Sequence, residues 1–202
     1  MYLKIKNRII HLLVIFFTKI KFKKSQFDKN ALLLQFKKVG VNFCIGEDYT
    51  VSNPQFMKIG DNFTALNRFR IEAIFKYKND TFTPSIQIGN NVIFNNDVHI
   101  GCINNIEIGD NCLFASRIYI TDHHHGSSDK SALNYAPTDR PLISKGPVII
   151  KNNVWIGEGV AIMPGVTIGE NSIIGTNAVV TKDVAPNSVM AGVPAKLIKT
   201  LI

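Results

Sequence analysis

Cysteine is scarce in this sequence, and its placement excludes several structural classes. The chain holds only Cys44, Cys102 and Cys112, an odd number with neither paired nor metal-like spacing. A disulfide framework is therefore not expected, and a reducing, cytoplasmic environment fits the chain best. Free cysteine is among the most buried residue types, so the simplest interpretation is that all three are small buried side chains.

Acidic residues are also few, 15 against 23 basic ones, so that the net charge is +8. The excess is concentrated at the N-terminus, where the first 24 residues contain seven lysines and arginines and no acidic residue. Such asymmetry points to an anionic partner, namely a membrane surface, a phosphorylated ligand or a nucleic acid. No nucleic-acid-binding motif is present, so we expect no nucleic acid partner.

A long hydrophobic run is missing as well. The stretch IIHLLVIFF at residues 9–17 is far shorter than the ~20 apolar residues of a spanning helix, and no small-residue cleavage site follows it, as a signal peptide requires. We expect residues 1–30 to form a short helical segment, with a basic, apolar or amphipathic helix over residues 2–24. Two interpretations remain open: this helix packs on the protein and its oligomer neighbours, or it contacts the inner, anionic face of a membrane.

A six-residue repeat runs through the rest of the chain. Aliphatic residues recur at Ile150, Ile156, Ile162, Ile168, Ile174 and Val180. A small or branched residue follows the first five of them four positions later, at Val154, Val160, Val166, Ser172 and Ala178. The same phase appears upstream at Ile88, Phe94, Ile100, Ile108, Phe114 and Ile120, with weaker echoes at Ile45, Val51, Ile59, Ala65 and Ile71.

A period of six fits neither the helical period of about 3.6 nor simple alternation. It predicts a mainly β solenoid over residues 31–202, with three short strands to a coil of about eighteen residues. The aliphatic residue of each hexad points inward and the small residue fills a corner. Gly-Asp-Asn, Gly-Asn-Asn and Gly-Glu-Asn supply backbone freedom at the corners. Because one coil cannot bury its own core, stacking stabilises the fold and both ends need caps.

Two interruptions of the repeat predict insertions. Between Ile71 and Ile88 a stretch rich in Lys, Asp and Thr reads as a surface loop. Between Ile120 and Ile150 about two dozen residues loop out, which we place at residues 126–149. Long loops in compact domains are usually functional or disordered, and sites tend to lie on loops over rigid scaffolds. We therefore interpret residues 126–149 as an active-site loop.

The motif ITDHHHG at residues 120–126 opens this loop with three of the five histidines. A zinc site would draw on His99 and one of the triplet, but adjacent residues on a strand point to alternating sides and rarely converge on one ion. A neutral imidazole suits the role of a general base at physiological pH. Asp122 either holds the turn through its side chain or orients an imidazole.

The closing stretch NVWIGEGVAIMPGVTIGENSIIGTNAVVTKDVAPNSVMAGVPAKLIK resembles the hexapeptide-repeat acyltransferases, and among them the O-acetyltransferases of sugars and polysaccharides. The resemblance covers roughly residues 40–200 and is most specific in the C-terminal third. It implies a left-handed parallel β-helix, acetyl-CoA as the acyl donor and no metal. It further implies a sugar hydroxyl acceptor, in a surface polysaccharide or its precursor, and a homotrimer with active sites at the subunit boundaries.

The resemblance also assigns roles near the loop. In the family the catalytic histidine lies five positions after an inward aliphatic residue, and Ile120 plus five is His125. His123 is the second candidate, because an inserted residue or a bulge would exchange the two, whereas His124 falls at a corner-filling position. Asn95 matches a family asparagine that contacts the acceptor, although asparagine also serves turns.

On the donor side the resemblance centres on VWIGEG. Trp155 matches a tryptophan near the acetyl group and the reactive sulfur, and the backbone amide of Glu158 matches the group that stabilises the oxyanion. The family positions that line the donor correspond to Gly157, Gly175, Thr176, Thr181 and Lys182. Lys196 and Lys199 stand where relatives use arginines toward the phosphates, so the pairing loses the bidentate fork.

These residues imply direct transfer, since none of the three cysteines falls near them in the sequence. Two readings of other classes remain open, a zinc-dependent lyase or hydrolase on the same scaffold and a non-catalytic solenoid that organises partners. The sequence leaves open which hydroxyl is acetylated and how long the acyl chain is.

Overall fold

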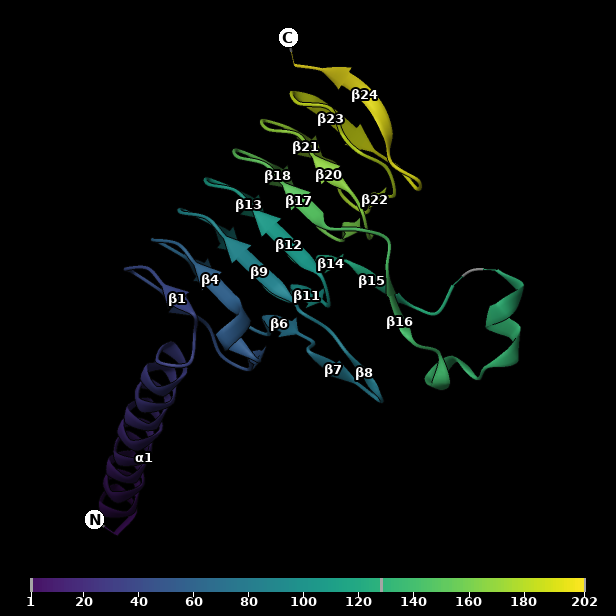
Figure 1. Cartoon of the computed structure of the whole chain (residues 1–202). Helices are drawn as coiled ribbons and strands as arrows, with labels where there is room; N and C mark the ends of the chain where they lie inside the picture. The colour runs from purple at the N-terminus through teal and green to yellow at the C-terminus, as the bar shows by residue number, and fades with distance from the viewer. Residues whose placement is uncertain (1, 128, 202) are drawn as a thin grey trace. The chain divides into compact units, whose positions relative to one another are not determined.

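The computed structural model describes residues 2–127 and 129–201 (Figure 1). The chain divides into two compact units, residues 1–36 and 37–202. The first unit is helix α1 (Tyr2–Leu33), which continues past the predicted end at residue 24 because no glycine or proline interrupts the sequence before Gly40. No helix within the described residues is both long and apolar enough to cross a membrane.

The second unit is a stack of coils built from three parallel sheets. Sheet A contains β1 (Lys38–Val39), β4 (Met57–Ile59), β9 (Ser85–Ile88), β12 (Asn105–Ile108), β17 (Val148–Ile150) and β20 (Thr167–Ile168). Sheet B contains β2 (Cys44–Ile45), β5 (Thr64–Ala65), β10 (Ile93–Phe94), β13 (Leu113–Phe114), β18 (Trp155–Ile156), β21 (Ile173–Ile174), β23 (Ser188–Ala191) and β24 (Lys196–Thr200). Sheet C contains β3 (Thr50–Ser52), β6 (Arg70–Ala73), β11 (His99–Cys102), β14 (Tyr119–Thr121), β19 (Ala161–Ile162) and β22 (Val179–Val180).

The coils follow one another in sequence order from β1 to β24 (Figure 1), which confirms the predicted solenoid. Each coil visits sheets A, B and C in turn, and strands in register bring equivalent hexad positions above one another, as where Ile100 pairs with Ile120 and Ile120 with Ile162. The antiparallel strand β24 covers β23 and closes the C-terminal end. We name the turns between the sheets the A–B, B–C and C–A corners.

The core forms as the repeat predicts. The inward residues of the C-terminal coils, from Ile150 to Val180, and the small residues at their corners are all buried. In the N-terminal coils aromatic rings replace the small corner residues: Phe63 and Phe69 are buried and contact Phe94, which stacks on Phe114 at 4.5 Å. Cys102 and Cys112 are buried, but the expectation was wrong for Cys44, which is exposed because it points outward on β2.

A ladder of asparagines fixes the A–B corner. Asn42, Asn62, Asn91, Asn111, Asn153, Asn171 and Asn187 all have φ between 57° and 59°, the left-handed region that asparagine tolerates better than most residues. Each side-chain amide donates to the amide oxygen of the next asparagine along the stack, over 2.7–3.2 Å. The ladder therefore satisfies polar side chains at the turn and aligns successive coils.

The B–C corner uses charged residues at the same backbone conformation. Asp48, Arg68, Asp97 and Arg117 have φ between 56° and 62°. Arg68 pairs with Asp97 in a bidentate contact, with Nη2 2.7 Å from Oδ2, and this bond raises the pKa of the guanidinium and lowers the pKa of the carboxyl. Such exposed pairs add little stability. The B–C corner therefore differs from the A–B corner in its charged residues and not in a strong stabilising contact.

Both predicted insertions leave the stack near sheet C. The first forms a hairpin, β7 (Lys76–Tyr77) and β8 (Asp80–Thr81), and a 3₁₀ turn η1 (Pro54–Phe56) lies in the coil before it. The second carries an antiparallel ribbon, β15 (His123–His125) and β16 (Leu142–Ser144), and the 3₁₀ turns η2 (Lys130–Asn134) and η3 (Pro137–Asp139). The insertion thus begins at His123, before the predicted start at residue 126, and it has secondary structure of its own.

Substitution of Asn91 tests the ladder. Asn91→Gly keeps the left-handed backbone accessible but removes the bonds to Asn62 and Asn111, so we expect a loss of about 1–2 kcal/mol in the free energy of unfolding. Asn91→Ala should lose about 1–2 kcal/mol more, because a β-carbon is disfavoured at positive φ. Urea denaturation measures both, with Asn134→Ala in the exposed turn η2 as control. Equal losses for Gly and Ala would contradict the role of backbone conformation.

Candidate active site

The polar site forms where β14 ends and the second insertion leaves the stack. Ile120 points into the core and Thr121 outward, and the next residue, Asp122, turns inward again and is completely buried. A buried carboxylate is costly unless its oxygens accept hydrogen bonds. The neighbouring coil supplies them at its own C–A corner.

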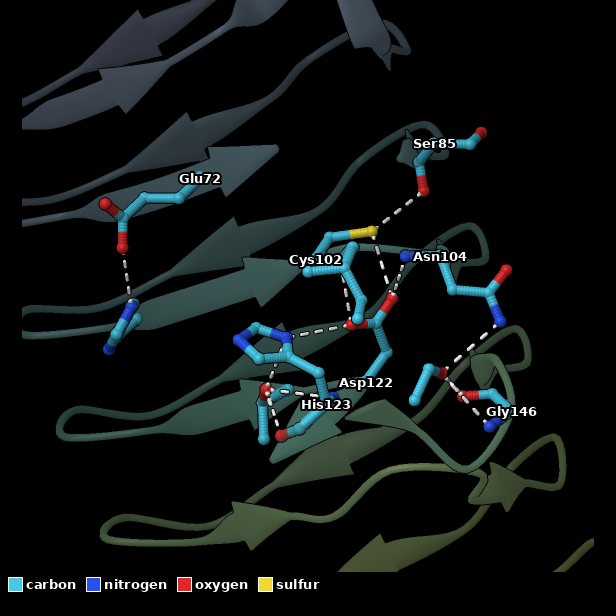
Figure 2. A network of polar contacts seen from close by, with 11 residues as sticks. Glu72, Ser85, Cys102, Asn104, Asp122, His123 and Gly146 are labelled. Carbon is cyan, nitrogen blue, oxygen red and sulfur yellow. Dashed lines mark hydrogen bonds and ion pairs between the residues drawn. The ribbon is translucent and has the colours of Figure 1, made fainter. Parts of the chain in front are cut away.

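Asp122 ties the two coils together (Figure 2). Its Oδ1 accepts the backbone N–H of Ile103 at 2.9 Å and its Oδ2 accepts that of Asn104 at 2.8 Å. The Sγ of Cys102 also donates to Oδ2 at 3.2 Å. Of the two roles considered for this side chain, Asp122 performs both, because it holds the turn of the neighbouring coil and also contacts an imidazole.

That imidazole is His123, whose side chain is only 9% exposed. Its Nδ1 lies 3.0 Å from Asp122 Oδ1 and 3.2 Å from Thr121 Oγ1. Because a carboxylate only accepts hydrogen bonds, Nδ1 carries the proton in the neutral ring and Nε2 keeps its lone pair. Figure 2 shows the second ring nitrogen on the edge of His123 that faces away from Asp122, so the lone pair is directed out of the buried network.

Cys102 lies beside this pair, contrary to the expectation that no cysteine approaches the motif. The inward register of β11 brings its thiol to Asp122, and the thiol also contacts Ser85 O at 3.4 Å. Burial, together with the Asp122 charge, raises the pKa of the Cys102 thiol far above its usual range. The thiol therefore stays protonated as a hydrogen-bond donor and is no nucleophile.

His124 and His125 continue the ribbon β15. His125 is exposed and its ring meets the Tyr77 ring edge-on, with centroids 5.6 Å apart. His124 is half-buried, and burial, followed by the charges of Lys145 and His123, lowers its pKa. Both rings line a cavity of about 360 Å³ together with Gly126, Ser127 and Lys145.

The first insertion contacts the second insertion next to His125. Lys78 Nζ lies 2.7 Å from Asp139 Oδ1, and Tyr77 Oη donates to the carbonyl of Thr138 at 3.3 Å. The hairpin β7–β8 therefore supports the ribbon that carries the histidines. The sequence placed both insertions but gave no sign that they touch.

His99 is half-buried on the outer face of sheet C. Its Nε2 lies 3.1 Å from Glu72 Oε2, and its ring lies against Tyr119 with centroids 5.3 Å apart. In residues 2–127 and 129–201, no three histidine, cysteine or acidic side chains converge so that they could hold a metal ion. His99 is thus paired with a carboxylate, and the zinc site that the sequence analysis considered for His99 and one of the triplet has no support among these residues.

The residues predicted to bind the donor gather mainly at the B–C corner. Gly157 follows β18 and Gly175 follows β21 directly above it; a β-carbon on Gly157 would come within 2.8 Å of Thr176 N. Trp155 points outward and is 50% exposed. The Glu158 carboxylate pairs with Arg117 Nη2 at 2.6 Å, while its amide has no hydrogen-bond partner among the described residues.

The remaining predicted residues lie apart from this group or at its margin. Asn95 follows β10 in the same column, and its backbone N–H donates to Phe114 O in the next coil. Because this column is at the B–C corner, Asn95 does not adjoin the histidines at the C–A corner. Thr181 and Lys182 follow β22 at the C–A corner. Lys196 and Lys199 are exposed on β24, with Lys196 opposite Ala191, whose side chain adjoins Gly175.

Within one chain, the predicted donor-binding residues and the candidate histidines lie far apart. Arg117, which contacts Glu158, stands at the B–C corner, and β14 then runs across sheet C to His123 at the C–A corner. At ~3.3 Å per residue, these six residues span roughly 20 Å. No acyl group bound at Glu158 could reach His123 of the same chain.

Comparison with known proteins identifies the family. A family model described as bacterial transferase hexapeptide (six repeats) matches residues 147–182. The chain is 37% identical over 152 residues to a putative lipopolysaccharide biosynthesis O-acetyl transferase, WbbJ of Escherichia coli strain K12, which covers 74% of this chain and 74% of the relative. The chain belongs to the hexapeptide-repeat acyltransferase family.

Solved structures agree with this assignment. The acyltransferase is 30% identical to a maltose O-acetyltransferase from Clostridium difficile 630, with a TM-score of 0.54 over 86% of this chain and 74% of that one. It is 28% identical to a galactoside acetyltransferase in complex with coenzyme A, with a TM-score of 0.50 over 86% and 70% of the two chains. The predicted left-handed β-helix is confirmed, and the comparisons support an acyltransferase over the alternatives of a lyase, a hydrolase or a scaffold.

Sequence reasoning missed several members of the site in this acyltransferase. Thr121 and Gly101 adjoin His123, and Glu72 pairs with His99. The outward hexad positions of sheet C could have suggested them, because Glu72, Gly101 and Thr121 are register partners. The insertion between Ile71 and Ile88 hid that register in the sequence.

Substitution of Gly101 tests the geometry around His123. A β-carbon there would lie 3.3 Å from His123 Cε1, so Gly101→Ala should displace the ring and lower transferase turnover by about 10-fold or more. The free energy of unfolding should change by less than about 1 kcal/mol, because the contact is with a side chain. Gly60→Ala is the contrast, since its β-carbon would meet the backbone of Gly89 at 2.6 Å and destabilise the fold. Unchanged turnover in Gly101→Ala would refute the assignment of this ring to catalysis.

Proposed function

We propose that this acyltransferase moves the acetyl group of acetyl-CoA to a sugar hydroxyl of a surface polysaccharide or its precursor. The observation that carries the proposal is the imidazole of His123, held by a buried carboxylate with one ring nitrogen left as an acceptor. Two comparisons support donor and acceptor: one similar structure is a galactoside acetyltransferase in complex with coenzyme A, and the relative WbbJ is named for lipopolysaccharide biosynthesis.

His123 is the proposed base, and His125 is the alternative. Family spacing favours His125, but that ring is exposed and contacts only the edge of Tyr77 in the described part of the chain. A base works best when a second group fixes its tautomer and orientation. Asp122 does this for His123 and is itself fixed by two backbone N–H groups, so the geometry favours His123.

The reaction follows by direct transfer. Nε2 of His123 takes the proton of the acceptor hydroxyl while its oxygen attacks the thioester carbonyl carbon. The backbone N–H of Glu158 stabilises the resulting oxyanion. The C–S bond then breaks, the acetyl ester leaves with the sugar, and the thiolate recovers the proton from the imidazolium. No acyl-enzyme is needed, and the thiol beside the imidazole, Cys102, is buried with a raised pKa.

The donor would lie along the B–C corner. Trp155 offers a large exposed ring beside the reacting group. Gly157 lies against the backbone of Gly175 and Thr176, and neither glycine places a side chain in this column. Lys196 lies at the upper end of the column, where it can pair with phosphate, and Lys199 is on the same strand. Thr181 and Lys182 lie at another corner and would contact the donor from a neighbouring subunit.

The site is complete only between two copies of the chain. The roughly 20 Å between Glu158 and His123 along one strand of sheet C requires that the base of one subunit face the donor corner of another. A closed ring of identical contacts satisfies every site equally, and we propose the homotrimer typical of the family. Exposed apolar residues on the outer face of sheet B, including Ile93, Leu113 and Trp155, would be buried in it.

Helix α1 is proposed to rest on an anionic membrane surface. Residues 13–17 are all apolar and exposed, and five successive residues cover a full turn. An exposed apolar turn of this kind is covered either by other apolar surfaces, as in a bundle of helices, or by the acyl boundary of a lipid bilayer. Flanking lysines and arginines attract anionic lipid by about 1 kcal/mol each, whereas in a bundle they would repel one another.

Single substitutions separate the two candidate bases. We expect His123→Ala to lower turnover by about 100-fold or more, and Asp122→Asn by a smaller factor, since general-base catalysis typically contributes 10²–10⁴-fold. Acetyl-CoA binding, measured by calorimetry, should persist near one site per chain in both variants. A fully active His123→Ala beside an inactive His125→Ala would transfer the role to His125, and no binding of acetyl-CoA by the native protein would end the transferase proposal.

Mixed oligomers test the shared site. His123→Ala and Trp155→Ala should each be nearly inactive alone. When the two are co-expressed, about a quarter of the interfaces in a randomly mixed ring combine both native residues, and turnover should recover to that extent. No recovery, or a monomeric mass by light scattering, would contradict the shared site.

Vesicle sedimentation tests the helix. The full chain should bind vesicles of phosphatidylcholine with phosphatidylglycerol more strongly than phosphatidylcholine alone, and salt should weaken the binding. Replacing Phe16 and Phe17 by Asn should abolish it, whereas Leu133→Asn, at an exposed apolar position of the loop, should not. Equal binding to neutral vesicles, or none to either, would contradict the proposal.

A further inference from the structure

A second imidazole–carboxylate pair faces the outer surface of sheet C beside His123. Two columns of outward residues cross β6, β11 and β14 at this point. Arg70, His99 and Tyr119 occupy one column and Glu72, Gly101 and Thr121 the other, as strand register requires. The mechanism proposed above uses none of the first column, nor Glu72.

Glu72 is the centre of this group. Its Oε2 accepts Arg70 Nε at 2.7 Å and contacts His99 Nε2 at 3.1 Å, and the side chain is only 19% exposed. Figure 2 shows Glu72 on the side of His123 that faces away from Asp122. Its Oε1 has no partner among the described residues and remains available as an acceptor.

His99 fixes the Glu72 carboxylate beside the base. Burial lowers its pKa, although the Glu72 hydrogen bond opposes the shift, so the ring is neutral at neutral pH. Because Nε2 points at a carboxylate, it carries the proton, and the lone pair is on Nδ1. Tyr119 holds one face of the ring. The free Oε1 of Glu72 is a suitable acceptor for a hydroxyl group, and the N–H of His99 holds the carboxylate in place.

Gly101 brings this pair next to the base. A β-carbon placed on Gly101 would lie 3.3 Å from His123 Cε1, 3.8 Å from His99 Nε2 and 3.9 Å from Thr121 Oγ1. The absence of a side chain at Gly101 lets the two imidazoles approach each other across the strand. A molecule in contact with His123 Nε2 therefore meets His99 and Glu72 at its edge.

We propose that Glu72 and His99 recognise a second hydroxyl of the acceptor sugar, adjacent to the hydroxyl that His123 deprotonates. The proposal rests on the function proposed above and narrows its substrate class to acceptors with two neighbouring free hydroxyls. Glu72 and His99 determine specificity together, since the free Oε1 of Glu72 accepts the hydrogen bond from the sugar, His99 positions that carboxylate, and neither takes a proton from the reacting oxygen. Arg70 and Tyr119 position them.

The test combines variants of the protein with variants of the sugar. Methyl glucoside, galactoside and mannoside, and their singly deoxygenated analogues, serve as acceptors, and release of the coenzyme A thiol reports transfer. We expect Glu72→Gln and His99→Phe to raise the KM for the preferred glycoside by about 10- to 100-fold with a smaller effect on kcat, because a hydrogen bond to a charged or polar partner is lost. Glu107→Gln, an outward glutamate on sheet A, is the matched control.

Removal of the recognised hydroxyl completes the cycle. The deoxy sugar should react with the native protein as poorly as the full sugar reacts with Glu72→Gln, and deoxygenation should cost the variant little more. If the losses from the deoxy sugar and from the substitution multiply, the two do not act through one contact, and the recognition role is overturned. Loss of acetyl-CoA binding in the variants would indicate a structural role and would also overturn it. A native protein that binds acetyl-CoA but acetylates no glycoside would overturn the sugar assignment and this inference together, whereas one that binds no acetyl-CoA fails at the earlier step.

Discussion

The hydrogen-bonded asparagine ladder at the A–B corner is the constraint on which the rest of the structure depends. Each asparagine adopts an unusual backbone conformation at the turn, and its side-chain N–H donates a hydrogen bond to the asparagine of the next coil. Neighbouring strands of a sheet are therefore in register, and inward residues such as Ile100 and Ile120 meet in the core. A slip of one residue would exchange core and surface positions on every strand after it.

Regular stacking at one corner allows irregularity at another. The two insertions both leave from sheet C, and the coils beneath them keep their register because the core and the A–B corner hold it. Asp122 uses this rigidity: a buried carboxylate is tolerated because the fixed turn at Ile103 and Asn104 presents two N–H groups to it. The contact with Asp122 also orients His123, so the scaffold that stabilises the charge fixes the imidazole as its proposed role in proton transfer requires.

Much of this architecture could be predicted from the hexad pattern, because a local period specifies local packing. The inward residues from Ile150 to Val180, their small corner partners and the position of both insertions follow from it. The pairing of Asp122 with His123 did not follow, since it depends on a break in the strand at Asp122. Nor did the proximity of Cys102, whose sequence distance from Asp122 corresponds to one complete coil.

The sequence by itself determined the solenoid, the residues of its core and the family to which the chain belongs, because these depend on a repeat that every coil carries. The tertiary structure decided which polar groups meet. Glu72, His99 and Gly101 come from different coils with an insertion between them, and only their strand register brings them together beside His123. The width of sheet C likewise separates Glu158 from His123 within one chain, and the proposed site therefore combines opposite corners of two chains.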